Sequence, residues 1–122
     1  MNMNLKYTSI ILMLALLLAD SAAATTCAVF VLDEYKMTVN NAQIYIDDSV
    51  SSIGTTAYHT GFGLNCWVGD LDLNGTHTLT AKWFRSRLNG LPYEGSEVVD
   101  FGKEAKMLIR IPTHVSLLFT LA

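Results

Sequence analysis

The sequence predicts an all-β protein, a β-sandwich of seven or eight short antiparallel strands that follows a cleaved N-terminal signal helix. Three observations predict it. Beyond residue 24, apolar residues recur with a period of two and not at helical spacing. Turn-forming residues separate these runs at intervals of roughly 8 to 12 residues. The first 24 residues have the organisation of an export signal.

The N-terminal segment is predicted to be a signal peptide covering residues 1–24. The uncharged run 10–19 reads IILMLALLLA, with Lys6 before it and small residues ending in Ala24 after it. A membrane-spanning helix needs roughly 20 apolar residues, which is about twice this length. We therefore expect a secreted or cell-surface protein with no membrane span after signal removal, in which residues 25–122 form a single domain.

Composition narrows the class of partner. The chain has 8 Lys and Arg against 11 Asp and Glu, a net charge of −3, and 51% hydrophobic residues. Removing the leader takes away Lys6 and Asp20 together, so the mature charge is unchanged. An acidic, apolar chain of this kind is too hydrophobic for a disordered tail and lacks a basic nucleic-acid footprint. We expect no nucleic-acid partner.

Alternation of apolar and polar residues marks the individual strands. Clear strands are expected at 27–32, 42–47, 76–84, 107–111 and 115–121, and weaker ones at 53–58, 64–71 and 97–101. The first of these is apolar on both faces, which suits a strand that is covered on each side. Turn residues stand between them, at 40–41, 61–63, 74–75 and 89–90, and Asn-Gly is the strongest hairpin signal among them.

Two cysteines, Cys27 and Cys66, remain after export. An even number in an exported chain predicts one disulfide, which would stabilise the fold by about 3 to 4 kcal/mol on the chain-entropy model. Two unconnected buried thiols are the alternative.

Several short motifs together resemble a known group. Residues 42–46 (AQIYI), Gly54-Thr55-Thr56, Thr60-Gly61 and residues 75–81 (GTHTLTA) resemble the carboxypeptidase regulatory-like group of transthyretin-like (prealbumin-like) β-sandwiches, which are Ig-like in architecture. The match covers about half of the mature chain, and Thr60 and Gly61 are adjacent where the group's turn separates the two residue types. The resemblance implies a non-catalytic extracellular module for binding or structural association.

Two other functions stay open at this point. One is a small transthyretin-like hydrolase. Such hydrolases end in Tyr-Arg-Gly-Ser, whereas this chain ends Phe119-Thr120-Leu121-Ala122, so none of their catalytic residues is carried over. A subunit of an extracellular filament or pilus-like assembly is the other alternative, with the apolar segments 27–32 and 115–121 pairing with a neighbouring copy. The expected partner is a protein or a glycan, or copies of the chain itself.

No metal or other cofactor is expected. Residues 70–75 begin like a calcium loop, but Ala81 stands where that loop needs its glutamate. The histidines His59, His77 and His114 lack metal-ligand spacing. Asn74-Gly75-Thr76 is a glycosylation sequon on an expected turn, which makes Asn74 a candidate glycosylation site.

Aromatic residues are the stronger indication of a binding surface. Tyr45, Tyr58, Phe84 and Tyr93 are the candidate contact residues, while Trp67 and Trp83 are expected to fill the core. Residues 82–87 (KWFRSR) combine bases with aromatics, a pattern that also occurs in single-stranded nucleic-acid sites. In an acidic exported protein we interpret this segment as a strand end with solvated charges.

Overall fold

The computed structural model describes residues 24–85, 90–102 and 104–116, and this part of the chain is all-β without a helix. The predicted signal peptide, apart from Ala24, lies outside the described residues. The strands within them are β1 (Thr25–Leu32), β2 (Gln43–Ile46), β3 (Gly54–Thr55), β4 (Ala57–His59), β5 (Leu64–Leu71), β6 (Gly75–Phe84), β7 (Pro92–Phe101), β8 (Lys106–Pro112) and β9 (His114–Val115).

Four strands form the first sheet, in the order β4-β5-β1-β8. β1 pairs antiparallel with β5, where Val29 lies opposite Trp67, and parallel with β8, where Val29 lies opposite Ile109. The sequence predicted antiparallel pairing throughout, and the β1–β8 pair contradicts this. β1 is therefore an inner strand, with a hydrogen-bonded neighbour on each side.

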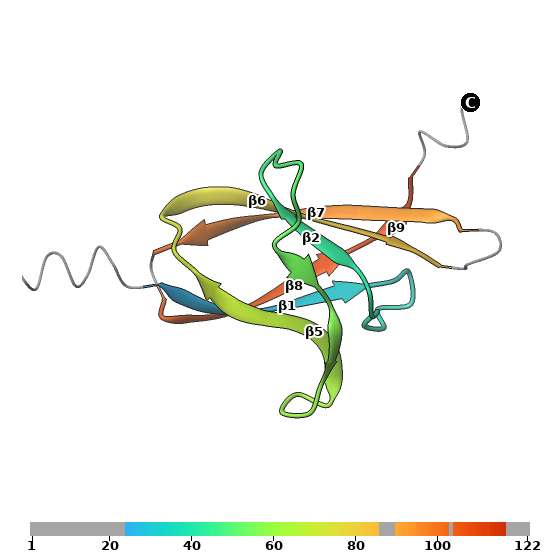
Figure 1. Ribbon diagram of the computed structural model, residues 1–122, viewed down its shortest axis with the longest axis horizontal. Coiled ribbons are helices and arrows are strands. Elements are labelled where there is room, and N and C mark those ends of the chain that lie inside the picture. Colours follow the sequence, from blue (N-terminus) through green and yellow to red (C-terminus); the bar gives the residue numbers. More distant parts are fainter. Residues whose placement is uncertain (1–23, 86–89, 103, 117–122) are drawn as a thin grey trace, which may run out of the picture.

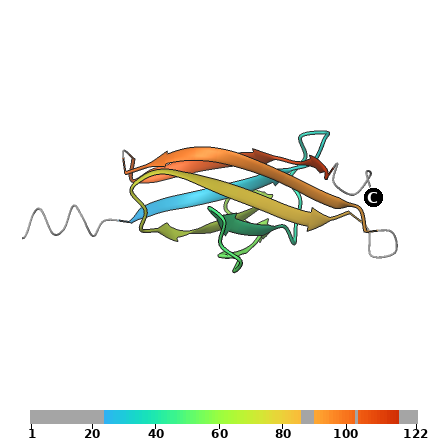
Figure 2. The same cartoon turned by 90° about the horizontal axis from the view of Figure 1, so that it is seen from above.

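Five strands form the second sheet, in the order β3-β2-β6-β7-β9. The longest strand pair in this sheet is the β6–β7 hairpin, which is paired without interruption from Gly75 opposite Phe101 to Phe84 opposite Pro92. Figure 1 shows this hairpin on the other side of the molecule from β1 and β5, and Figure 2 shows that the strands run lengthwise along an elongated body.

The core lies between the inner faces of the two sheets. Because side chains alternate along a strand, Val29 and Val31 of β1 point to the same side as Ile109 and Ile111 of β8, and they meet residues of the second sheet such as Leu79. All of these are at most 4% exposed. Each fully buried side chain of this size contributes about 1.5 to 3 kcal/mol of transfer free energy.

Most of the expected strands are confirmed. The segments at 27–32, 42–47, 64–71, 76–84 and 107–111 coincide with β1, β2, β5, β6 and β8, and the one at 97–101 is the end of the longer β7. The run at 53–58 is divided into β3 and β4, which belong to different sheets. Of the expected strand at 115–121, only the first residues lie in the described part, within and just after β9.

The Asn74-Gly75 turn does not close a hairpin. It connects β5 of one sheet with β6 of the other, and Gly75 has φ +79°, a value that favours glycine. The predicted turn is present, but its flanking strands are not paired. The hairpin of this region is β6–β7, whose connection contains the predicted turn at Asn89-Gly90; Asn89 lies outside the described residues.

The chain crosses from β8 to β9 at a tight contact with β7. A Cβ placed on Gly95 would lie 1.9 Å from the carbonyl oxygen of Pro112. Beside this contact, the Trp83 indole Nε1 donates to Thr113 Oγ1 at 2.8 Å, and that hydroxyl donates to the Leu32 carbonyl at 2.7 Å. Glycine and a buried threonine therefore hold the two sheets together at this side.

Both tryptophans pack as the sequence predicts. Trp83 is 8% exposed in the core. Trp67 is partly buried against the core, and its indole lies in a slot over Gly54 and Gly69, where an added Cβ would meet ring atoms at 2.4 Å and 2.6 Å. Both glycines leave the space that the indole fills.

The predicted disulfide is not formed, because the two cysteines lie on opposite faces of the first sheet. Cys27 pairs with Gly69, three residues along β5 from Cys66, and an odd offset turns the side chains to opposite faces. The offset also separates them by about 10 Å along the strand, beyond the Cα separation of about 7 Å that a bridge tolerates. Both are buried free thiols, and desolvation raises the pKa of each.

Candidate functional site: a polar groove on the second sheet

The outer face of the second sheet carries rows of polar side chains. Gln43, Lys82 and Glu94 form one row across β2, β6 and β7. Thr80 and Ser96 belong to the next row and share a hydrogen bond of 2.9 Å between their hydroxyl oxygens. These residues point outward because their strand neighbours point into the core. The sheet therefore presents hydrogen-bonding groups on a rigid surface.

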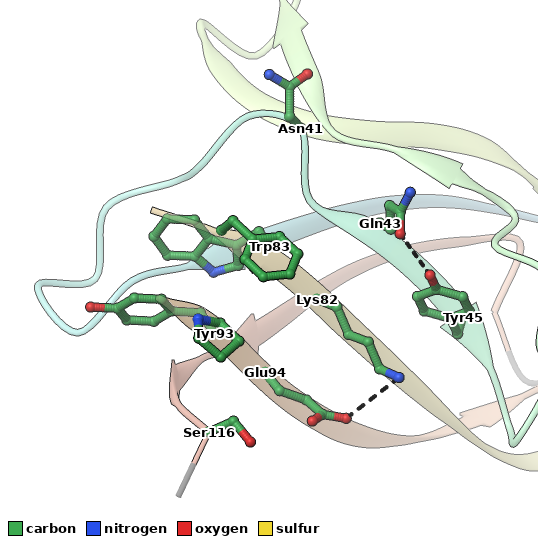
Figure 3. Close-up of a pocket in the computed structure, with 10 residues that line it drawn as sticks. Asn41, Gln43, Tyr45, Lys82, Trp83, Tyr93, Glu94 and Ser116 are labelled. Atoms are coloured by element: carbon green, nitrogen blue, oxygen red, sulfur yellow. Dashed lines mark hydrogen bonds and ion pairs between the residues drawn. The ribbon is translucent and has the colours of Figure 1, made fainter. Parts of the chain in front are cut away.

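Tyr45 is fixed on this face by its neighbours. Its hydroxyl donates to Gln43 Oε1 at 2.6 Å, and the Lys82 ammonium lies 5.1 Å from the centroid of its ring. Lys82 Nζ is also 4.0 Å from Glu94 Oε1. Figure 3 shows these two pairs side by side on the sheet. The network holds an aromatic ring, an amide, a cation and a carboxylate in one place before any ligand arrives.

A groove of about 540 Å³ runs over this network. Tyr45 lines it on β2 and Phe84 lines it on β6, with Lys82 between them in the ladder, and Asn41 and Ser116 complete its rim. Phe84 is 69% exposed although it is a large apolar residue. About 13 Å of strand separate Phe84 from Thr80, the ladder partner of Tyr45. The groove is thus long enough for an extended ligand.

A second groove of about 500 Å³ adjoins the first at the end of the sheet. The two share Asn41, Trp83 and Phe84, so Phe84 stands between them. The second groove adds mostly polar groups: Asp33, Thr38, Asn40, Asn65 and Arg85. Together they form a continuous polar surface that bends around one exposed aromatic ring.

The floor of this region is a stack of rings and a guanidinium group. Trp83 and Tyr93 stack with centroids 4.4 Å apart, and the Arg85 guanidinium lies 5.0 Å from the Tyr93 ring. Glu34 forms an ion pair with Arg85 and raises the pKa of its guanidinium. Desolvation is the main reason that the pKa of Tyr93 is raised. The stack makes the floor stiff.

The structure brings three of the four candidate contact residues together. Tyr45, Phe84 and Tyr93 line the same groove. Tyr58 is 65% exposed on β4 of the first sheet and lies away from it. Tyr93 was expected at the surface but is 3% exposed, because it points inward opposite Trp83. The expected exposure of Tyr93 is therefore wrong, although Tyr93 does line the groove.

In the basic and aromatic segment 82–87, the charged side chains that the structure describes are each paired with an acidic residue. Lys82 and Phe84 point outward and Trp83 points inward, as alternation requires, whereas Arg85, one residue beyond β6, is exposed. Lys82 faces Glu94, and Arg85 pairs with Glu34. The segment does not present a row of free bases, and its residues from 86 to 87 lie outside the described part.

Residues 70–75, which begin like a calcium loop, make contacts within the protein instead. Asp70 accepts a hydrogen bond from Thr26 Oγ1 at 2.7 Å, and Leu71 and Leu73 pack on the core. Across residues 24–85, 90–102 and 104–116, no three His, Cys, Asp or Glu side chains converge as metal ligands would. The histidines lie on three strands: His77 pairs with Asp47, His59 contacts Phe62, and His114 is opposite Glu94.

Asn74 lies in the exposed connection between β5 and β6, and Thr76 is exposed as well. The backbone carbonyl of Asn74 accepts a hydrogen bond from His77 Nε2, whereas the Asn74 side chain is at the surface. The sequon is therefore accessible, as a glycosylation site has to be.

His77 joins the end of β2 to the turn before β6, a contact that sequence reasoning missed. Its Nδ1 lies 2.8 Å from Asp47 Oδ2, and its Nε2 lies 2.9 Å from the Asn74 carbonyl oxygen. Both partners only accept hydrogen bonds, so both ring nitrogens donate best in the imidazolium form. The hydrogen bond with Asp47 is the main reason that the pKa of His77 is raised and that of Asp47 is lowered.

This pair predicts a pH-dependent stability. The raised pKa of His77 means that its contribution is complete below its unfolded value of about 6.5 and is lost as the pH rises through the higher folded pKa. The lowered pKa of Asp47 means that its contribution is complete above about 3.9 and is lost as the pH falls through the lower folded pKa. His77→Gln should therefore lower Tm more at pH 5.5 than at pH 8.5.

The matched control is His59→Gln on β4, where the ring contacts Gly61 and Phe62. Thermal unfolding followed by circular dichroism at both pH values measures the difference. An equal loss of Tm at the two pH values in His77→Gln would contradict the charged pairing.

Comparison with known proteins adds nothing to this geometry: no family model matches the chain, and no curated protein or solved structure is significantly similar to it. In the residues that the structure describes, no helix is long and apolar enough to cross a membrane.

Proposed function

We propose that this chain is an exported, non-catalytic β-sandwich module of transthyretin-like type that binds an extended glycan in the groove between Tyr45 and Phe84. Export rests on the leader, in which an apolar run is followed by small residues ending in Ala24. The sandwich rests on the two sheets whose inner faces share one core. The transthyretin-like type rests on the sequence resemblance.

The observation that carries the proposal is the exposed Phe84 ring beside a preformed polar network. Sugars offer hydroxyl groups at their edges and apolar C–H faces, so they need an aromatic surface next to both donors and acceptors. Phe84 supplies the surface, and Gln43, Lys82 and Glu94 supply the polar groups. Because these side chains are already held in place, little conformational entropy is lost on binding.

Phe84→Ala tests the proposal. We expect the variant to bind its glycan about 10- to 30-fold more weakly, as for a contact worth ~1.4 to 2 kcal/mol. Phe84 is 69% exposed, so the substitution should leave the fold intact. The purified protein is first screened on an array of neutral and acidic oligosaccharides, and the strongest ligand is then titrated by calorimetry.

Tyr58→Ala is the control, because Tyr58 is exposed to a similar degree on the other sheet. Its affinity should match that of the wild type. Equal losses in the two variants, or no glycan bound on the array, would refute the proposal.

A second candidate function is a subunit of an extracellular filament. One observation favours it: β8 is an outer strand of its sheet and has β1 as its only ladder partner in the described part of the chain. The free ladder edge belongs to β8 and not to residues 27–32, since β1 has a neighbour on each side. Light scattering on the purified protein separates the candidates, because a monomer at all concentrations contradicts assembly.

A further inference from the structure

The outer face of the first sheet carries a second, quite different groove. It has a volume of about 460 Å³ and is lined mostly by apolar side chains: Phe30, Leu32, Met37, Phe62, Leu64 and Leu108. Met37 and Leu108 are 65% and 60% exposed, whereas Phe30 at the floor is 6% exposed. Contiguous exposed apolar surface on an exported protein indicates a binding site.

The two walls of this apolar groove are preformed. On one side the turn at 33–37 is held by Asp33, whose Oδ1 accepts hydrogen bonds from the backbone N–H groups of Tyr35 and Met37. On the other side Phe62 packs edge-on against Phe30, with centroids 5.4 Å apart, and Gly63 N donates to the His59 carbonyl at 2.8 Å. A groove with two fixed walls suits a single small ligand better than it suits the flat surface of a partner protein.

Charge at the rim identifies the chemistry of the ligand. Lys36 and Arg110 both line the apolar groove. In the described part of the chain neither forms an ion pair, whereas Arg85 on the other sheet pairs with Glu34. The lining polar residue Thr38 already bonds with its hydroxyl and its carbonyl to Asn65. The groove thus combines an apolar floor and walls with two unpaired cations and few other polar groups.

We propose that this groove binds a fatty acid, a single acyl chain with a carboxylate head group. The chain would lie over Phe30 between Met37 and Phe62, and the carboxylate would lie between the cations of Lys36 and Arg110. Removing apolar surface from water favours binding in proportion to chain length, and a charge-assisted contact with the carboxylate fixes the orientation. The site is independent of the glycan groove, which lies on the opposite sheet.

Titration calorimetry with laurate below its micelle concentration tests the proposal on the purified protein. We expect saturable binding of one laurate per chain, about 15-fold tighter than decanoate because two methylenes are lost. Dodecyltrimethylammonium, with an equal chain and the opposite charge, should bind at least about tenfold more weakly. Lys36→Gln/Arg110→Gln should reduce laurate affinity by about 10- to 100-fold and remove the preference for the anion.

Lys82→Gln, which removes a cation from the other sheet, is the control and should bind laurate as the wild type does. Leu108→Asp should abolish binding without unfolding the protein, since Leu108 is largely exposed. Equal affinity for the two amphiphiles, or equal losses in Lys82→Gln and the double variant, would overturn the proposal. So would sedimentation with anionic vesicles in the absence of laurate binding, or a dimer that buries this face.

Discussion

Replacing Gly95 with alanine is expected to destabilise the protein by on the order of 3 kcal/mol. The new Cβ would lie 1.9 Å from the Pro112 carbonyl oxygen and 3.1 Å from Thr113 Cα. These are backbone atoms and cannot rotate away as the end of a side chain could. The β8–β9 crossing would have to move away from β7.

Chemical denaturation with urea measures the change, with the midpoint shifted and the slope retained if the native fold is kept. Ser96→Ala is the matched control, because Ser96 is the next residue of β7 and points outward. Its effect should stay near 0.5 kcal/mol. If Gly95→Ala were as mild as Ser96→Ala, the close approach of Pro112 to β7 would be wrong.

The second large effect is expected from Thr56→Val, a change that keeps the volume and removes one hydroxyl. Thr56 is fully buried, and its Oγ1 donates to the Val39 carbonyl at 2.7 Å and accepts from Ala42 N at 3.0 Å. Valine would leave both backbone groups without a partner. An unsatisfied buried group costs about 1 to 3 kcal/mol, so the total loss should be about 2 to 4 kcal/mol.

Thr55→Val is the control for this loss. Thr55 precedes Thr56 in the chain and is exposed on β3, so the same chemical change there leaves no buried group unpaired. Urea denaturation of the two variants side by side gives the difference. Similar stabilities would show that the Thr56 hydroxyl does not satisfy the turn at Val39 and Ala42.

The sequence predicts the strands better than their partners. Alternation at 42–47 and 76–84 identifies which side chains are buried, and Ile44 and Leu79 are indeed fully buried. The same alternation occurs in parallel and antiparallel strands, so it could not reveal that β1 and β8 run parallel. Nor could it reveal that Thr56 divides the segment 53–58 between two sheets, because its partners Val39 and Ala42 are distant in sequence.

The same limit applies to the site. Tyr45 and Phe84 could be predicted because each lies on the outward side of a clear strand. Tyr93 was misplaced because the strand was expected to begin only at 97, so the alternation was not followed back to its inward position. The disulfide prediction failed for a related reason: the count of two cysteines contains no information on register, and register puts them on opposite faces.

The parallel pairing of β1 with β8 also bears on how the chain folds. Thr26 lies opposite Lys106, so this inner strand of the first sheet pairs with a strand that is synthesised 80 residues later. Contacts of such long range slow folding, since the entropy cost of closing a long loop comes before the contacts can stabilise it. Until then the apolar strand 25–32 has an unpaired edge. A truncation ahead of Lys106 should therefore leave an aggregation-prone product.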